Sequence, residues 1–353
     1  MENLIYIGTY TKKEGHVDGK AEGIYSVYQN TKNGRLRFGE TVAEITNPSF
    51  VKVSRDGKNL YAVSELGPKD AESGFVFSYK INEDDSLTEI GKISTEAFAP
   101  CHIEIDNTGK FVFVSNYLGG VVMVYHRNKN GILEKKQRLD IADPEISHPH
   151  SVTVSPDNKH FYVADLGSDK IFIYDFDSEG NIKPNKMPFL SLEKSSGPRH
   201  LCFSKNGNFI YVVNELNNSL KVLEVSTGGE LKLLQELSTL PEDFSGKNSA
   251  ADIHLHPSGR FLYVSNRGHN SIAAYKIEEN SGKVELIGFT DTEGEIPRNF
   301  AIDPQGKFLY VANQNSNSVT SFNINSKNGI LSPNSSVLEI KTPVCVEFSM
   351  YPN

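Results

Sequence analysis

The chain has 353 residues, 38% of them hydrophobic, and a net charge of −8 from 36 basic and 44 acidic side chains. It contains no run of about 18 apolar residues that could span a bilayer. The negative charge, with no run of basic residues to offset it locally, would repel nucleic acid. We therefore expect neither a membrane protein nor a nucleic-acid-binding protein.

The N-terminus and the cysteines both bear on the compartment. Residues 1–8 (MENLIYIG) have no basic region followed by a long apolar stretch, so they do not resemble a signal peptide. A leader removed before this start would leave the same pattern. Cys101, Cys202 and Cys345 have no metal-like spacing and occupy similar places in different repeats. We expect unpaired structural thiols, a cytoplasmic protein, and a monomer or weak dimer.

The extended segments begin at residues 4–7 and 23–28, and a repeated phrase follows them. Residues 54–64 (SRDGKNLYAVS) and 303–313 (DPQGKFLYVAN) show its form. Its turn position recurs every 47 to 52 residues, at Gly57, Gly109, Asn158, Gly207, Gly259 and Gly306. A period near fifty in strand-rich units predicts a propeller, here one closed domain over residues 1–353.

Each repeat contains four extended segments. In the third repeat they lie at residues 151–154, 161–164 and 170–174, with a weaker one near Ile182. The second segment is apolar almost throughout, as in residues 261–264 (FLYV), which is typical of a strand buried on both faces. No stretch has a sustained helical period. We expect four-stranded antiparallel blades stacked face to face around an axis.

The first strands give the number of blades. Most begin with proline, which suits the first residue of a strand because its missing N–H need not break the ladder. The seven starts are Pro48, Pro100, Pro149, Pro198, Ala250, Pro297 and Pro343. The last copy stops after residues 344–348, so the N-terminal segments must complete its blade. The predicted fold is all-β, a seven-bladed β-propeller whose closing blade is shared by the two termini. The absence of tryptophan excludes WD40 blades.

Two rings of variable residues are expected at one rim. The first strand of a blade lines the channel and the second runs back beside it, so first-strand starts and second-strand ends meet there. The residues after the first-strand starts are Ser49, Cys101, His150, Arg199, Ala251, Arg298 and Val344. Those at the ends of the second strands are Tyr10, Glu65, Tyr117, Leu166, Glu215, Arg267 and Gln314. These positions differ most between copies, so we expect the functional site among them.

Four of these residues are candidate catalytic groups. His150 and Glu215 could each act as the base, while Arg199 and Arg267 could hold an anion or a developing oxyanion. The alternative for His150 is a strand-edge histidine satisfied by backbone, and for the arginines an inter-blade ion pair with Glu215 or Glu65.

Four further residues are candidate substrate-binding groups. They are Glu65, Arg298, Tyr117 and Gln314. Arg298 fits the same ring as a third anion contact, and Glu65 occupies the slot of Glu215 in another blade. One of the two glutamates could be catalytic and the other only an arginine partner.

Histidines on the first strands raise the question of a metal. His254 and His256 alternate on one strand, and His102 and His200 occupy corresponding slots on two others. No carboxylate-rich cage or tight His/Cys spacing accompanies them. We expect neither a metal nor a cofactor.

The sequence resembles the lactonase family of seven-bladed propellers, whose best-known members are cycloisomerase-type 6-phosphogluconolactonases. The likeness runs from residues 5–10 (IYIGTY) through 47–49 (NPS), 148–151 (HPHS), 197–200 (GPRH) and 251–254 (ADIH) to the truncated last strand. The family includes the fungal 3-carboxy-cis,cis-muconate lactonizing enzyme. Its proposed His, Arg, Glu, Arg quartet maps onto His150, Arg199, Glu215 and Arg267.

The resemblance implies metal-free opening of an anionic sugar lactone, 6-phospho-D-glucono-1,5-lactone, in the pentose phosphate pathway. The same quartet serves lactonization in the fungal relative, so it does not select the reaction. A lactonase or cycloisomerase acting on another sugar or carboxylate lactone is one alternative, and a non-catalytic binding propeller is another. The mixture of Arg, His and Glu at one mouth argues against the last.

Overall fold

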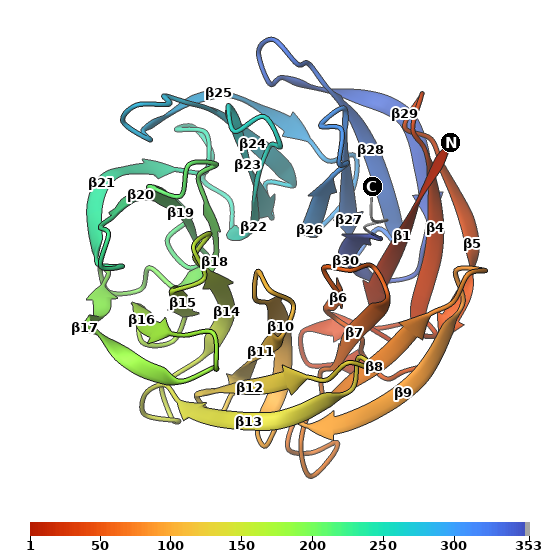
Figure 1. Ribbon diagram of the computed structural model, residues 1–353. Coiled ribbons are helices and arrows are strands. Elements are labelled where there is room, and N and C mark those ends of the chain that lie inside the picture. The colour runs from red at the N-terminus through yellow and green to blue at the C-terminus, as the bar shows by residue number, and fades with distance from the viewer. Residues whose placement is uncertain (350–353) are drawn as a thin grey trace.

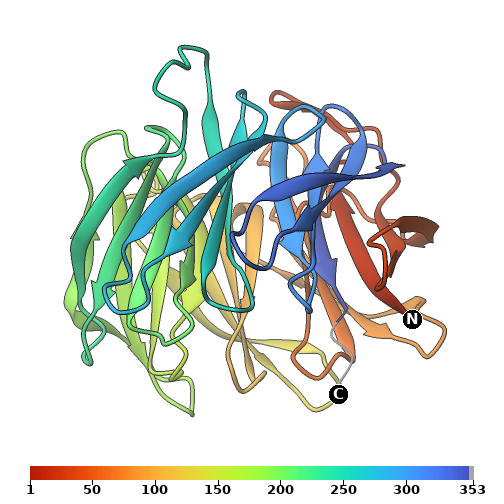
Figure 2. The same cartoon turned by 90° about the horizontal axis from the view of Figure 1, so that it is seen from above.

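The computed structural model describes residues 1–349 and contains only strands, turns and loops. Seven four-stranded antiparallel sheets surround a central axis (Figure 1). Seen at right angles, the inner strands run close to the axis direction and the outer strands are turned away from it (Figure 2), as the natural twist of a sheet requires. The prediction of a seven-bladed β-propeller is confirmed. The predicted single domain extends to residues 350–353, which lie outside the described residues.

The strands follow one order in every blade, from the axis outward. The first strands are β6 (Val51–Val53), β10 (Phe98–Ile105), β14 (Pro149–Val154), β18 (Pro198–Phe203), β22 (Ser249–Leu255), β26 (Pro297–Ile302) and β30 (Pro343–Phe348). The second strands are β7 (Asn59–Ser64), β11 (Phe111–Leu118), β15 (His160–Asp165), β19 (Phe209–Asn214), β23 (Phe261–Arg267), β27 (Phe308–Asn313) and β1 (Glu2–Thr9).

The remaining strands form the outer half of each blade. The third strands are β8 (Phe75–Ile81), β12 (Val121–Arg127), β16 (Lys170–Phe176), β20 (Ser219–Val225), β24 (Ser271–Ile277), β28 (Ser318–Ile324) and β4 (Ile24–Asn30). The fourth strands are β9 (Leu87–Ser94), β13 (Leu133–Asp140), β17 (Ile182–Ser191), β21 (Leu231–Ser238), β25 (Val284–Asp291), β29 (Leu331–Glu339) and β5 (Leu36–Ala43). A two-stranded hairpin, β2 (Lys13–Glu14) and β3 (Val17–Asp18), is inserted between β1 and β4.

Three first strands begin elsewhere than predicted. Strand β6 starts at Val51 rather than Pro48, because Ser49 N–H closes a tight turn onto Asn47 O (2.7 Å) and Pro48 O accepts Thr9 N–H from the closing blade (3.0 Å). Strand β10 starts two residues before Pro100, where Phe98 pairs with Leu118. Strand β22 starts at Ser249, one residue before Ala250.

The core lies between the blades. Every residue of β7, β19 and β27 is buried, which confirms that the second strand is covered on both faces. Phe113 of β11 and Val163 of β15 belong to one apolar cluster, and Val213 of β19 and Val264 of β23 to another. Neighbouring blades therefore share their cores.

The repeated tyrosine of the second strand also joins neighbouring blades. The hydroxyl of Tyr61 donates to Gly131 O in the outer turn of the next blade (2.8 Å), and Tyr263 does the same to Gly329 O (2.8 Å). Gly131 and Gly329 have φ of 84° and 75°, a conformation that glycine adopts without strain. The same bond is made by Tyr162, Tyr211 and Tyr310.

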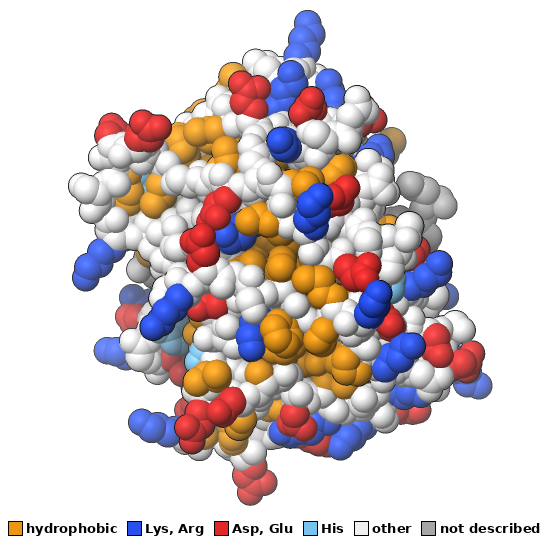
Figure 3. All heavy atoms as spheres, turned by 90° about the vertical axis from the view of Figure 1, so that its left-hand side faces the viewer, with side chains coloured by type: hydrophobic (Ala, Val, Ile, Leu, Met, Phe, Trp, Pro, Cys, Tyr) orange, Lys and Arg blue, Asp and Glu red, His pale blue; other side chains and the backbone are white. Residues whose placement is uncertain are grey.

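The outer surface mixes charges of both signs. On the side of the ring that bears β17 and β21, acidic and basic side chains are interspersed with apolar patches (Figure 3). Within residues 1–349 no helix is long and apolar enough to cross a bilayer. Cys101, Cys202 and Cys345 are free thiols, as predicted, and burial raises the pKa of each.

The closing blade joins the two ends of the chain. Strand β30 pairs antiparallel with β1, with Ile5 opposite Phe348 and Ile7 opposite Val346. Val344, Cys345, Val346 and Phe348 are each at most 8% exposed. The ring thus has no free inner edge at its seam.

A chain that ends at Thr342 should not give a stable monomeric fold. It loses β30 and exposes the ladder of β1, and each lost apolar side chain contributes about 1.5–3 kcal/mol, so the sum rivals a typical total stability. The control is a chain ending at Ser349. Size-exclusion chromatography and thermal melting should show a cooperative monomer for the control and aggregation for the shorter chain. Equal melting of the two would contradict the role of the seam.

Candidate functional site

Three of the predicted residues occupy β-bulges. The pairing of first and second strands shifts between Pro149 and Ser151, between Pro198 and His200, and between Pro297 and Asn299. The extra residues at these shifts are His150, Arg199 and Arg298. A bulge leaves one residue out of the ladder and re-aims its side chain. The bulges explain why these residues face the channel mouth instead of alternating with the pleat.

The second ring is tied to the first by backbone hydrogen bonds. Glu215 N–H donates to Gly197 O (2.7 Å), and Gln314 N–H donates to Ile296 O (3.0 Å). Gly197 and Ile296 each precede a first-strand proline and have φ of 63° and 57°. For a β-branched residue such as Ile296 this conformation is strained, and its neighbours must hold it. The two rings therefore meet at one rim, as predicted.

A cavity of about 430 Å³ opens at this rim. We call it the main cavity. The predicted residues that line it are His150, Glu215, Arg267, Glu65, Arg298 and Tyr117. Gln314 instead lines a side hollow of about 230 Å³, which shares His16, Arg267 and Arg298 with the main cavity. Arg199 lies behind Glu215 and is only 2% exposed.

Glu215 is held between two arginines. Its Oε2 lies 3.0 Å from Arg199 Nε and 2.9 Å from Arg267 Nη2. Both contacts are ion pairs, and Arg199 Nε has no hydrogen-bond partner among the described residues. Arg199 also donates to Ala251 O (2.6 Å), and Arg267 to Ala250 O (3.2 Å). The ion pairs with Glu215, which the sequence analysis gave as the alternative role of the two arginines, are therefore present, and Glu215 and Arg267 also line the main cavity.

The charges at this rim perturb one another. Burial raises the pKa of Glu215, but the positive charges of Arg267, Arg199 and Arg298 outweigh it and hold the pKa below its ordinary value. Burial, followed by the charges of Arg267 and Arg298, lowers the pKa of Arg199 to about 10. Glu215 is thus an ionised carboxylate at neutral pH and a poor proton acceptor.

Glu65 and Arg298 face the main cavity from the two blades that flank the closing blade. Glu65 Oε2 accepts hydrogen bonds from Tyr10 Oη (3.0 Å) and from Ser49 Oγ. The guanidinium carbon of Arg298 lies 5.5 Å from the ring centre of Tyr10. Within residues 1–349, Arg298 makes neither an ion pair nor a hydrogen bond through its guanidinium. The site therefore contains three arginines and three glutamates, since Glu14 also lines the main cavity, and Arg298 is the one of these arginines without an ion-pair partner among the described residues.

His150 is an uncharged base at this rim. It is 4% exposed, and its Nδ1 is buried with no hydrogen-bond partner among the described residues. Burial, followed by the charge of Arg199, lowers its pKa well below the usual 6.5. The ring of Tyr117 packs edge-on against His150 and stacks on His148, which bonds Tyr117 O through Nδ1 (2.7 Å). His148 therefore helps to hold Tyr117 in the wall of the main cavity.

The β2–β3 hairpin contributes residues that the sequence reasoning missed as site residues. Glu14 and His16 line the main cavity beside Tyr10, which belongs to the predicted second ring. His16 packs edge-on against Tyr10 (5.4 Å between ring centres), and Glu14 Oε1 accepts Asn47 Nδ2–H (2.7 Å). The length of the connection between β1 and β4 could have indicated this insertion. It has 14 residues, whereas most blades join their second and third strands by a short turn. No group of three His, Cys, Asp or Glu in the described chain could hold a metal ion.

Comparisons with known proteins agree with the seven-bladed fold. A family model described as lactonase, 7-bladed beta-propeller, matches residues 4–348. The 6-phosphogluconolactonase of Bacillus subtilis is 31% identical over 352 residues, 97% of each chain. The structure of a periplasmic gluconolactonase of Pseudomonas aeruginosa superposes with a TM-score of 0.91 at 30% identity and covers both chains completely. An uncharacterized protein of Lactococcus lactis is 34% identical over 307 residues, 85% of this chain and 86% of its own.

The expected family and its enzyme class are thereby confirmed. The match to one family model runs from β1 to β30 and so includes all seven blades of the ring. The chain belongs to the lactonase family of seven-bladed β-propellers.

Proposed function

We propose that this protein hydrolyses 6-phospho-D-glucono-1,5-lactone to 6-phosphogluconate in the cytoplasmic pentose phosphate pathway. The observation that carries the proposal is the Arg298 guanidinium, which lines both the main cavity and the side hollow and, within residues 1–349, makes neither an ion pair nor a hydrogen bond. A phosphate, which carries a charge of about −1.5 to −2, would give this guanidinium an anionic partner. The Bacillus subtilis relative, named as a 6-phosphogluconolactonase, supports this substrate.

The main cavity holds the lactone ring in this proposal, and the side hollow takes the phosphate. The two share Arg267 and Arg298, so a sugar bound in the main cavity can reach the same cations with its phosphate. Gln314 and His16 add hydrogen-bonding groups to the side hollow. Arginine suits this task because its planar fork donates to two phosphate oxygens at once.

His150 is the proposed base. A water oxygen attacks C1 of the lactone while His150 takes the water proton, and the carbonyl oxygen becomes an oxyanion near Arg267. Collapse of this intermediate breaks the bond between C1 and the ring oxygen, which receives the proton back from His150. The new carboxylic acid then ionises to solvent. Glu215 keeps Arg267 and Arg199 in place and stays ionised throughout, since its pKa is lowered.

Gluconolactone without phosphate is the second candidate substrate. The Pseudomonas aeruginosa structure, named a periplasmic gluconolactonase, supports it. The chemistry at C1 would be the same, and only the side hollow would differ in use. The two substrates are therefore separated by the contribution of Arg298.

The wild-type protein should consume enzymatically generated 6-phosphogluconolactone well above the spontaneous rate. Arg199→Ala and Glu215→Ala should each lower kcat/KM by at least about 100-fold, on the scale of losing one catalytic or charge-stabilising group. Stopped-flow pH detection on a panel of lactones measures both. Near-normal turnover in the two variants would contradict the assignment of the site. If the wild-type protein turned over no lactone at all, the proposed function would be wrong.

Arg298→Gln should change selectivity more than chemistry. We expect kcat/KM for the phosphorylated lactone to fall by about 10- to 100-fold, the scale of a lost charge-assisted contact, with gluconolactone affected by less than about 3-fold. Arg260→Gln, an exposed arginine beside the repeated turns of the opposite rim, is the control. An equal loss on both lactones would show that Arg298 does not read the phosphate.

The pH profile should report His150 as a base of low pKa. With gluconolactone, which has no titrating phosphate, kcat/KM above the spontaneous rate should stay level from pH 8 down through 6.5. It should fall only well below that value, because protonation of His150 removes the base and its pKa is depressed. An acid limb centred near 6.5 would contradict this assignment.

A further inference from the structure

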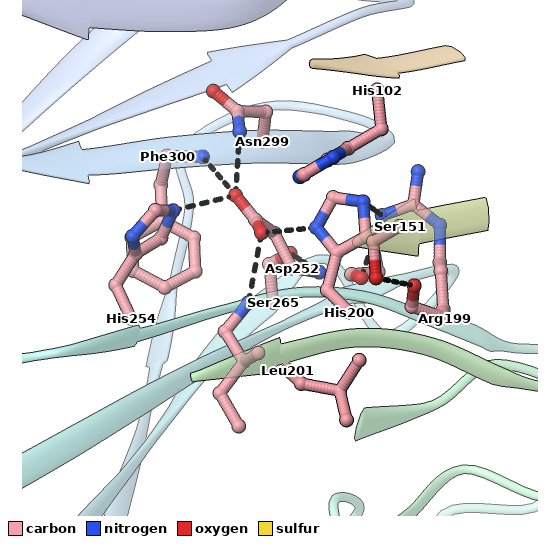
Figure 4. A network of polar contacts seen from close by, with 12 residues as sticks. His102, Ser151, Arg199, His200, Leu201, Asp252, His254, Ser265, Asn299 and Phe300 are labelled. Carbon is pink, nitrogen blue, oxygen red and sulfur yellow. Dashed lines mark hydrogen bonds and ion pairs between the residues drawn. The ribbon is translucent and has the colours of Figure 1, made fainter. Parts of the chain in front are cut away.

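A polar network connects first strands of neighbouring blades next to Arg199 (Figure 4). Its centre is Asp252, 2% exposed and placed at the irregular pairing of β22 with β23. One oxygen, Oδ1, accepts His200 Nδ1–H (2.7 Å) and Ile253 N–H (2.9 Å). The other, Oδ2, accepts His254 Nε2–H (2.9 Å) and Asn299 Nδ2–H (2.5 Å). The carboxylate is therefore surrounded by donors.

These bonds fix the tautomer of His200. An ionised carboxylate can only accept, so the ring proton of His200 must be on Nδ1, and Nε2 then has a lone pair. Arg199 Nη1 lies 3.4 Å from this Nε2, and a guanidinium can only donate. Burial, followed by the charge of Arg199, lowers the pKa of His200 to about 4, so the ring is neutral near pH 7.

The network therefore continues into the proposed active site. Asp252 orients His200, His200 accepts from Arg199, and Arg199 lies 3.0 Å from the carboxylate of Glu215. The ring of His200 also packs edge-on against the ring of His150, with 5.2 Å between centres. One imidazole thus contacts both the proposed base and the arginine behind Glu215.

We infer that Asp252 and His200 are positioning residues for the reaction, which hold the guanidinium of Arg199 beside Glu215 and hold the ring of His150. The inference rests on the proposed function of the main cavity. Neither residue lines that cavity, so both act through Arg199 and His150 and not on the substrate. Small displacements of such supported groups are costly, because the reaction depends on their direction.

Two substitutions break the chain of bonds at different points. His200→Asn can still donate to Asp252 but is too short to accept from Arg199. Asp252→Asn sets an NH₂ against donors in either orientation, because Oδ1 accepts from His200 and Ile253 and Oδ2 accepts from His254 and Asn299. With the NH₂ at the Oδ1 position, the proton of His200 moves to Nε2, against Arg199; with the NH₂ at the Oδ2 position, the bonds from His254 and Asn299 that hold residue 252 in place are lost.

We expect either substitution to lower kcat by about 10- to 100-fold, the scale of losing an outer-shell partner, while KM changes by less than about 3-fold. The KM should hold because Arg298 and the side hollow are untouched. His200→Gln, which reaches the Nε2 position with an amide oxygen, should restore most of kcat. His254→Gln is the matched control, because His254 also bonds Asp252 but has no contact with Arg199.

Steady-state kinetics with 6-phosphogluconolactone and crystal structures of the variants test the inference together. The structures should show Arg199 turned away from Glu215 in His200→Asn and unchanged in His254→Gln. The inference is overturned if His200→Asn and Asp252→Asn keep wild-type kcat, or if His254→Gln loses as much. If one variant does not fold, the other decides. Should wild type hydrolyse no lactone, the proposed function fails, and the position of Arg199 in the structures still decides the positioning role.

Discussion

The pairing of β30 with β1 is the constraint on which the rest of the structure depends. It joins the last described strand to the first, so the seven blades close and no inner strand edge is left free at the seam. It also fixes the start of the loop that follows β1. Tyr10, tied to Thr342 by a backbone bond of 3.1 Å, then meets Glu65 from the next blade. The seam is therefore part of the site as well as of the scaffold.

Closure of the ring alone would give seven equivalent positions at the rim. The bulges allow the side chains at these positions to differ and to face the channel mouth. Each bulge removes one residue from the ladder, so its side chain can differ without disturbing the core between blades. His150, Arg199 and Arg298 all occupy such positions. The repeated tyrosine bonds, by contrast, leave little freedom at the other end of the second strand. Within one repeat, the tyrosine of the second strand thus stabilises the contact between blades, and the bulge of the first strand carries the residue of the proposed active site.

The three arginines of the site, Arg199, Arg267 and Arg298, differ in their burial and in their ion-pair partners. Arg199 and Arg267 share the single carboxylate of Glu215, while Arg298 has no such partner in the described chain. Asp252 and His200 hold Arg199 without adding charge to the cavity, because His200 is neutral. A site built this way can bind an anion at one end and keep an uncharged base at the other.

The repeat period, the strand-opening prolines and the truncated last copy were enough to predict the blade number, the shared closing blade and the rim at which His150, Glu215 and Arg267 meet. These features follow from local patterns that recur in each copy. The depth of Arg199 behind Glu215, the side hollow at Gln314 and the entry of His16 into the cavity were decided by the tertiary structure. They depend on bulges and on an inserted hairpin, and contacts between blades distant in sequence leave no periodic signal.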